Sequence, residues 1–234
     1  MEETKISGLD EFLKAIKGRS RNLGWLFRGH SDKEWPLKPK VGREAAWLNR
    51  EREMFDAWKR SAYEHVESGA NLTDWDWLTI AQHHGLPTRL LDWAKNPLAA
   101  AYFAVSEAAV IKPETDAAIF AFHLEDDVDP LTTMSPFDFS GVVLFLPRRV
   151  VARIGRQLGV FTVHGSPGQD LTTALPGARL MKMVIQKELK HKFLLDLSDL
   201  AIDQFSLFPD LDNLSTHIGW IEKMRGDLND RAVP

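Results

Sequence analysis

The chain has 234 residues, a net charge of -4 and an ordinary globular balance of 44% hydrophobic and 26% charged residues. This charge excludes the strong basic field of non-specific nucleic-acid binders, although a local basic patch is compatible with it. The absence of cysteine excludes disulfides, thiolate zinc sites and thiol nucleophiles. The polar, acidic N-terminus is typical of neither a signal nor a transit peptide, and no apolar run reaches the ~20 residues of a spanning helix. We therefore expect a soluble cytoplasmic protein that makes no membrane contact.

The N-terminal half is predicted to be mainly helical. From their composition, apolar spacing and end signals, helices are indicated at residues 7–17, 44–67, 74–84 and 96–109. Ser7, Asp74 and Asn96 are the candidate N-caps, and Pro97 suits the first turn of the last helix. Apolar runs predict strands at residues 25–29 and 88–93, and the segment 31–44, with two prolines, predicts a loop.

Most of the strands are predicted in the C-terminal half. Short β-branched or aromatic runs bounded by Gly, Pro and Asp indicate strands at residues 117–125, 141–147, 159–165 and 180–186. Helices are indicated at residues 150–157, 187–200 and 210–223. This order predicts an α+β fold with a mixed or mostly antiparallel sheet and helices concentrated in the N-terminal half, not an alternating doubly wound fold.

Arg28 lies at the end of a predicted buried strand. A guanidinium there keeps its charge and needs an anionic or hydrogen-bonding partner. One interpretation is a salt bridge to a core carboxylate such as Asp92. The other is a clamp for the phosphate or carboxylate of a ligand, because the planar guanidinium suits both groups. The sequence leaves both interpretations open.

Arg89, Asp92 and Trp93 surround two leucines just before the helix predicted at 96–109. In an extended segment Arg89 and Asp92 point to opposite faces, so we do not expect them to pair with each other. Asp92 is either a structural acceptor for backbone N–H groups at the helix terminus, or the residue that orients Arg28 or polarises a ligand.

Other polar residues also have two interpretations. His83 ends a helix, where it either caps the C-terminus or orients a ligand, and adjacent histidines there are poor metal ligands, so no metal site is expected. In the strand predicted at 159–165, alternation places Thr162 and His164 on one face and Phe161 on the other. His164 is either a plain strand-end histidine or a ligand-binding residue. The acidic segment 207–213 lacks the glycine and further ligands of a calcium loop and indicates a turn and helix cap.

Two residues near the C-terminal strands are candidates for a polar role in a site. Gln157 ends a predicted helix just before a glycine, where it is either a solvent-facing residue or a functional one. Glu188 lies at the start of a predicted helix, where it is either a residue that gains from the helix dipole and needs no catalytic explanation or a functional one.

Four stretches together resemble the FRG domain, a family of protein domains encoded in bacterial and phage genomes and named for its Phe-Arg-Gly motif. They are LFRGHSD (26–32), AQHHGLPTRLLDWAKNPLAAAYFA (81–104), RQLGVFTVHG (156–165) and LFPDLDN (207–213). The positions that match the first three motifs are Phe27, Arg28, Gly29, Gln82, His83, Gly85, Pro87, Thr88, Arg89, Asp92, Trp93, Gln157, Gly159 and Phe161. The resemblance implies a single FRG domain over residues 1–234, with a helical region at about 44–84 before the central motif.

The layout of this family is similar to the ADP-ribosyltransferase fold, which implies NAD as a substrate. Arg28 and Gly29 would match the first motif of that fold, residues 88–93 with the following helix the second, and Gln157 or Glu188 the third. NAD cleavage passes through an oxocarbenium-like state that depends mainly on electrostatic placement.

The same similarity implies roles for particular side chains. Arg28 would hold the pyrophosphate, Trp93 or Phe161 would lie against the nicotinamide, and Gln157 or Glu188 would lie near the ribose. The ligand-binding set indicated in this way is Gly29, His83, Thr88, Arg89, Trp93, Phe161 and His164. We expect Arg28, Arg89, Asp92 and Trp93, together with Gln157, to meet in one pocket.

Two functions are open at this point. One is an NAD-using ADP-ribosyltransferase or NAD glycohydrolase without a metal, acting as a toxin or phage-defence effector on a protein or nucleic-acid acceptor. The alternative is a non-catalytic module that binds a nucleotide or nucleic acid through Arg28 and Asp92, and the absence of Glu from RQLGVFTVHG favours it. A purely structural role for Arg28, Asp92 and Trp93 is the third interpretation.

Overall fold

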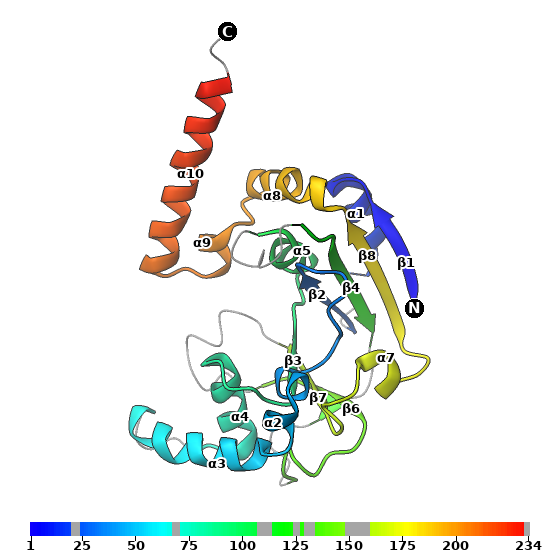
Figure 1. The fold of residues 1–234 in the computed structure, drawn as a ribbon, viewed down its shortest axis with the longest axis vertical. Helices are drawn as coiled ribbons and strands as arrows, with labels where there is room; N and C mark the ends of the chain where they lie inside the picture. Colours follow the sequence, from blue (N-terminus) through cyan, green and yellow to red (C-terminus); the bar gives the residue numbers. More distant parts are fainter. Residues whose placement is uncertain are drawn as a thin grey trace.

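A computed structural model of the protein describes residues 1–19, 24–66, 71–106, 114–123, 127–128, 134–147 and 160–231. Within these residues the fold is α+β, with two four-stranded sheets that are mostly antiparallel. The sheets lie face to face and helices cover their outer faces, so four layers follow one another from α8 to α3 (Figure 1). The predicted fold class is confirmed.

The first sheet contains strands from both halves of the chain. Its strands, in spatial order, are β1 (Glu2–Ile6), β8 (Arg179–Ile185), β4 (Ala117–His123) and β2 (Trp25–His30). The helices on its outer face are α1 (Leu9–Ile16), α5 (Pro97–Val105) and α8 (Lys190–Asp199). Phe12, Phe27 and Phe193 are almost fully buried between these helices and the sheet. Because β1 pairs in parallel with β8, residues from the first and last parts of the chain share one core.

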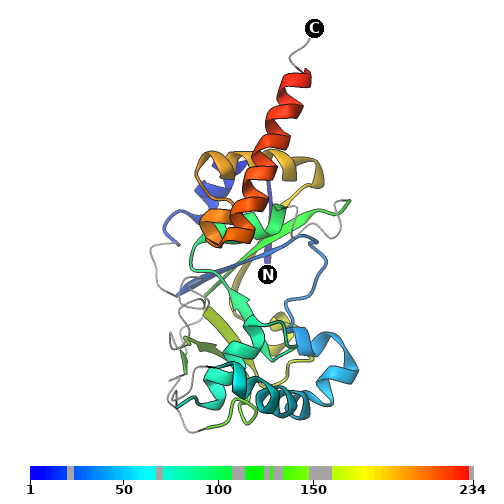
Figure 2. The ribbon, with the colours of Figure 1, turned by 90° about the vertical axis from the view of Figure 1, so that its left-hand side faces the viewer.

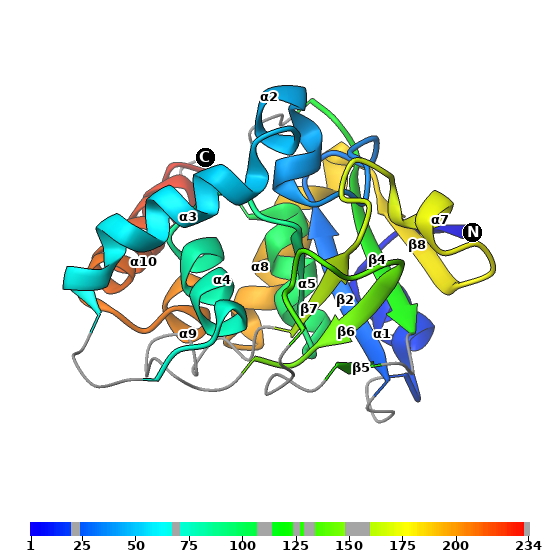
Figure 3. The ribbon, with the colours of Figure 1, turned by 90° about the horizontal axis from the view of Figure 1, so that it is seen from below.

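The second sheet is smaller and carries the central motif. Its strands, in spatial order, are β3 (Leu90–Trp93), β7 (Val160–His164), β6 (Val142–Phe145) and β5 (Asp127–Val128). Helices α3 (Glu51–Ala62) and α4 (Asp74–His83) pack on its outer face, and both lie to the left of β7 and β6 in Figure 3. Phe55, Trp75 and Phe145 are buried in the core that they form.

Among the described residues, one isolated backbone bridge joins the two sheets, where β2 meets the end of β3. The N–H of Phe27 donates to the carbonyl of Ala94 at 2.8 Å, and the N–H of Ala94 donates back at 2.7 Å. Beside this join, Leu26 and Phe122 of the first sheet pack against Leu91 of the second in a shared inner core. The bridge therefore brings the Phe-Arg-Gly motif directly against the central motif.

The remaining elements are short, apart from the last helix. They are η1 (Lys40–Arg43), α2 (Ala45–Leu48), η2 (Tyr63–His65), α7 (Leu171–Ala174), η3 (Lys187–Leu189), α9 (Gln204–Leu207) and α10 (Leu211–Arg231). Helix α10 projects away from the body of the protein (Figures 1 and 2). None of the helices in the described ranges has the length and apolarity required to cross a membrane.

Two predicted helix starts are shifted by one residue. Helix α4 is capped by Thr73, whose side chain and that of Asp76 form a capping box, so the prediction of Asp74 as the cap is wrong. The N-cap of α1 is Gly8 and not Ser7, because the Ser7 hydroxyl donates to Glu11 instead. Asn96 does cap α5, with its side-chain oxygen accepting from the N–H of the residue after Pro97.

Other differences concern whole elements. The single helix expected at 44–67 is divided into α2, α3 and η2, with a break before residue 51. The edge strand β1 was not predicted, since its pattern contains one buried residue, Ile6, and no alternation to detect. The helix predicted at 150–157 lies outside the described residues.

Gly29 is required for the contact between β2 and α5. A Cβ atom at this position would overlap the carbonyl oxygen of Ala100 and would lie 2.6 Å from the nitrogen of Ala104. Both atoms belong to the backbone of α5 and cannot rotate away. Close packing against α5 therefore explains why the third residue of the Phe-Arg-Gly motif is a glycine.

We expect Gly29→Ala to lower the free energy of unfolding by about 3 kcal/mol or more, because the helix must move away from the sheet. Urea denaturation measures this change. Gly219→Ala is the matched control, since a Cβ there meets open space on a helix and alanine favours the helix. Equal stability of the Gly29→Ala variant and the wild-type protein would contradict the packing explanation.

Candidate functional site

A cavity of about 520 Å³ opens beside the join between the two sheets. Its wall is built from β2, β3, the end of α4, one face of α5 and the turn after α9. The side chains with polar groups that face it include Arg28, His30, Arg43, Gln82, His83 and Asp92. The cavity thus collects residues from both the Phe-Arg-Gly motif and the central motif.

Arg28 reaches the cavity because strand alternation places it on the inner face of β2, together with Leu26 and His30. Its Nη1 donates to the backbone carbonyl of Asp92 at 2.7 Å, and its Nε donates to Nε2 of His30 at 2.9 Å. Nη2 makes no hydrogen bond to any residue that the structure describes, and 17% of the side chain is exposed. Arg28 is therefore oriented by two neutral acceptors and keeps N–H groups for a ligand.

His30 is a neutral acceptor for Arg28. Burial, followed by the charge of Arg28, lowers the pKa of His30 from 6.5 to about 2. Since Nε2 accepts a hydrogen bond, the proton of the neutral ring is assigned to Nδ1. Burial also lowers the pKa of Arg28, and the carboxylate of Asp92 opposes that effect, but an arginine stays protonated in proteins.

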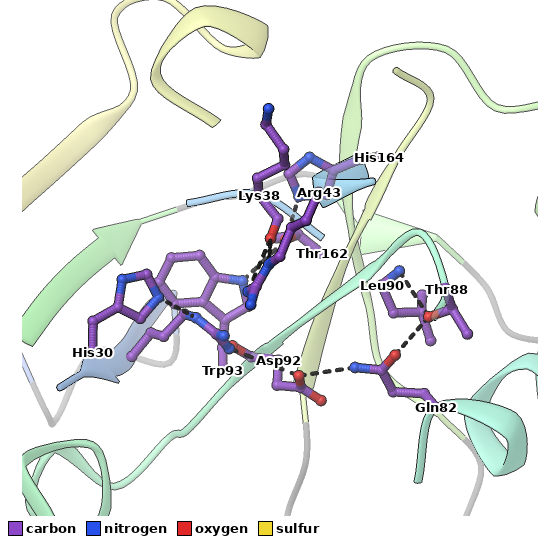
Figure 4. Close-up of polar contacts among 11 residues, drawn as sticks. His30, Lys38, Arg43, Gln82, Thr88, Leu90, Asp92, Trp93, Thr162 and His164 are labelled. Carbon is purple, nitrogen blue, oxygen red and sulfur yellow. Dashed lines mark hydrogen bonds and ion pairs between the residues drawn. The ribbon is translucent and has the colours of Figure 1, made fainter. Parts of the chain in front are cut away.

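The carboxylate of Asp92 is held from α4. Gln82 Nε2 donates to Asp92 Oδ2 at 2.9 Å, and Gln82 Oε1 accepts from the hydroxyl of Thr88 at 2.6 Å (Figure 4). Arg28 Nη1 lies 3.7 Å from the same Oδ2, so the ion pair is looser than the bond to the backbone. Thr88 itself is buried and acts through Gln82, so it positions the site without lining the cavity.

Arg43 is a second guanidinium at the cavity. Its Nε and Nη2 donate to the backbone carbonyl of Lys38 at 3.3 and 3.2 Å, which orients the side chain (Figure 4). Burial lowers the pKa of Arg43, and its charge contributes to the lowered pKa values of Arg28 and His30. Among the described residues of the wall, two guanidinium groups thus face one carboxylate, Asp92, and the excess positive charge favours an anionic ligand.

Arg89 lies elsewhere, so its prediction as a pocket residue needs correction. Its guanidinium forms a buried ion pair with Glu51 of α3, with Nη2 2.6 Å from Oε2 and Nε 3.1 Å from both carboxylate oxygens. Nη1 also donates to the backbone carbonyls of Pro136 and Phe137 at 3.3 and 3.4 Å. With all three nitrogen atoms engaged, Arg89 fastens α3 and the segment 136–137 to the start of β3.

Trp93 and His164 belong to a buried chain of hydrogen bonds. Trp93 Nε1 donates to Thr162 Oγ1 at 3.0 Å, and the same oxygen lies 2.9 Å from His164 Nε2 (Figure 4). Thr162 and His164 therefore share one face of β7, and Phe161 packs on the other, as alternation predicted. Trp93 and Phe161 line the cavity although each is at least nine-tenths buried, and His164 does not reach its wall within the described part of the chain.

The other predicted site residues are Gly29, His83, Glu188 and Gln157. Gly29 and His83 line the cavity. The backbone of Gly29 also packs closely against α5. Glu188 is exposed in η3 and is not part of the wall that the described residues form. Gln157 lies outside the described residues. The third motif of the ADP-ribosyltransferase comparison therefore gains no carboxylate from Glu188 at this cavity.

Sequence reasoning overlooked several residues of the wall, among them His30, Arg43, Phe103 and Phe208. Strand alternation from Arg28 could have found His30, and the spacing from Ala99 along α5 could have found Phe103. No local signal was available for Arg43 and Phe208, which reach the cavity from η1 and from the turn after α9. Among the described residues, no group of three or more His, Cys, Asp or Glu side chains is placed to hold a metal ion.

We expect Glu51→Ala to lower the free energy of unfolding by about 3–5 kcal/mol, because the buried charge of Arg89 then has no carboxylate partner. The matched control is Glu53→Ala, which removes a carboxylate with 66% of its side chain exposed and should change stability by less than about 1 kcal/mol. Chemical denaturation compares the two variants. Similar losses for both would contradict the structural role of the Glu51–Arg89 pair.

We expect stability to fall as the pH is lowered from about 6.5 towards 4, because burial lowers the pKa of His164 from 6.5 to about 4. In this pH range His164 takes up a proton when the protein unfolds. Between about pH 6.5 and 4 this lowers the free energy of unfolding by on the order of 3 kcal/mol. His164→Gln keeps a polar atom near the position of Nε2 and should reduce the pH dependence of the unfolding free energy, while buried His30, whose pKa is also lowered, still contributes to it. An unchanged slope, or an equal effect from His65→Gln at an exposed site, would contradict this assignment.

Comparison with known proteins gives one match. Residues 24–112 match the family model described as the FRG domain, which covers the Phe-Arg-Gly motif and the central motif that meet at the cavity. The stretches RQLGVFTVHG and LFPDLDN lie beyond the matched range. No curated protein and no solved structure matched the chain. Over residues 24–112, less than half of the chain, the protein is therefore similar to the FRG domain family.

Proposed function

We propose that the cavity binds NAD and that the protein is an NAD-using ADP-ribosyltransferase or NAD glycohydrolase. The observation that carries the proposal is Arg28, a largely buried guanidinium whose two assigned partners are a neutral imidazole and a backbone carbonyl. Its remaining N–H groups suit the pyrophosphate of a dinucleotide, with Arg43 adding a second positive charge. A volume of about 520 Å³ is within the usual range of ligand sites.

In this proposal Asp92 replaces Glu188 as the carboxylate that acts during cleavage. The bond between the ribose C1′ and the nicotinamide nitrogen breaks, and the electron pair leaves with nicotinamide, which becomes neutral. Positive charge develops on the ribose and is stabilised by the carboxylate of Asp92, which Gln82 holds in place. Water or a nucleophile of a protein or nucleic-acid acceptor then adds to C1′ and releases a proton. Action as a toxin or phage-defence effector would follow from this activity.

A second candidate is a module that binds a nucleotide or nucleic acid without cleaving it. The hydrogen bond from Gln82 and the nearby charge of Arg28 favour it, since both already engage the carboxylate of Asp92. The same cavity and the same arginine would serve for binding, so the two candidates differ in turnover and not in the position of the ligand.

Release of free nicotinamide from NAD by the purified protein tests the first candidate. We expect Asp92→Asn to lower kcat/KM by about a hundredfold or more, because the amide cannot stabilise positive charge. We expect Arg28→Lys mainly to raise KM, because lysine lacks the forked donor geometry. Asp56→Asn and Arg60→Lys, on the exposed side of α3, are the matched controls and should retain full activity.

The outcomes separate the two candidates. Wild-type release that is abolished by Asp92→Asn supports NAD cleavage. No release, together with calorimetric NAD binding that weakens in Arg28→Lys, overturns cleavage and supports the binding module. Release that is unchanged in both variants, with the folded state verified by circular dichroism, contradicts the cavity as the site.

A further inference from the structure

The stretch LFPDLDN, at the end of α9, supplies part of the cavity wall. Its first two residues, Leu207 and Phe208, line the cavity. Its polar residues fix this turn, because Asp210 Oδ1 accepts from the N–H of Asn213 at 2.8 Å and caps α10. The side chain of Gln204 in α9 donates to Asn213 Oδ1 at 2.6 Å, and this bond connects α9 to the start of α10 across the turn. The turn therefore holds Phe208 in place.

Phe103 completes this end of the cavity from α5. Ala99 and Phe103 are four residues apart and share the helix face that lines the cavity. The rings of Phe103 and Phe208 have centroids 5.7 Å apart and are tilted by 54°. Phe103 is 37% exposed, which is unusual for a phenylalanine and leaves ring surface uncovered.

The aromatic residues predicted from the sequence have less free surface. Trp93 is 3% exposed, is stacked on Phe122 at 5.1 Å and uses its N–H on Thr162. Phe161 is 6% exposed and packs in the core under α4. Both are already covered, so a planar ligand ring finds more uncovered aromatic surface at Phe103 and Phe208.

We infer that Phe103 and Phe208 form a ring-binding subsite for the heteroaromatic base of a nucleotide whose phosphates lie on Arg28 and Arg43. This inference rests on the proposed nucleotide binding and adds the orientation of the ligand. The cavity has a cationic wall, formed by Arg28 and Arg43, and an apolar aromatic wall, formed by α5 and the turn after α9. A ligand that joins a planar ring to phosphate matches both walls, and aromatic stacking is tolerant of the base.

Calorimetry with NAD and with inorganic pyrophosphate tests the inference. We expect Phe103→Leu and Phe208→Leu each to weaken NAD binding about tenfold, since leucine keeps apolar volume but loses stacking. Pyrophosphate has no ring, so its affinity should stay within about twofold in both variants, whereas Arg28→Lys should weaken both ligands. Tyr63→Leu is the matched control, because Tyr63 is 75% exposed on η2 and does not line the cavity.

Each outcome has a distinct meaning. Unchanged NAD affinity in both phenylalanine variants, with weaker binding in Arg28→Lys, overturns the ring subsite and leaves nucleotide binding intact. An equal loss of NAD and pyrophosphate affinity in the phenylalanine variants also overturns it, because the effect is then on the cavity as a whole. Absence of NAD binding by the wild-type protein overturns both the subsite and the proposed function. Thermal melting verifies folding, and Phe103→Leu decides the question alone if Phe208→Leu is unfolded.

Discussion

The site depends on the join between Phe27 and Ala94. Two backbone hydrogen bonds there connect the sheets, whose apolar inner faces also pack against each other. The join sets the position of the next residue along β2, so that Arg28 reaches over the edge of β3 to the carbonyl of Asp92. Gly29 then allows α5 to approach the same strand closely, which closes one wall of the cavity. In the Phe-Arg-Gly motif, the first residue thus connects the two sheets, the second supplies a positive charge at the cavity, and the third allows α5 to pack closely against β2.

The electrostatic arrangement around Arg28 differs from that around Arg89, although both arginines are largely buried. Arg89 is satisfied by a carboxylate and two carbonyls, as expected for a structural ion pair. Arg28 is oriented by a neutral histidine and a carbonyl, while the nearest carboxylate oxygen remains 3.7 Å away. An incompletely neutralised charge in a cavity is costly without a ligand and favourable with an anionic one. This contrast is the physical basis for assigning a structural role to Arg89 and a binding role to Arg28.

Local signals in the sequence predicted much of the fold but less of the site. The start of α5 follows from Asn96 and Pro97, whose effects act within one helical turn. The faces of β7 follow from alternation, which is also local. By contrast, the placement of Arg89 was decided by Glu51, 38 residues earlier in the chain, which no local pattern indicates.

Local sequence patterns also failed to identify some residues of the cavity wall. Arg43 reaches it from η1, and Phe208 reaches it from the turn after α9, far from the central motif in sequence. Tertiary packing alone brings these residues to Arg28, so motif spacing could not reveal them. LFPDLDN was interpreted as a turn and helix cap, which its polar residues confirm, but that interpretation did not account for Phe208.

The most direct test of the account is a crystal structure of the protein bound to NAD. The account predicts that the pyrophosphate lies in the cavity beside the join, with a phosphate oxygen within hydrogen-bond distance of Arg28 Nη2. NAD bound at another surface, or in this cavity with its phosphates turned away from Arg28, would contradict the central claim that this arginine is the anion-binding group.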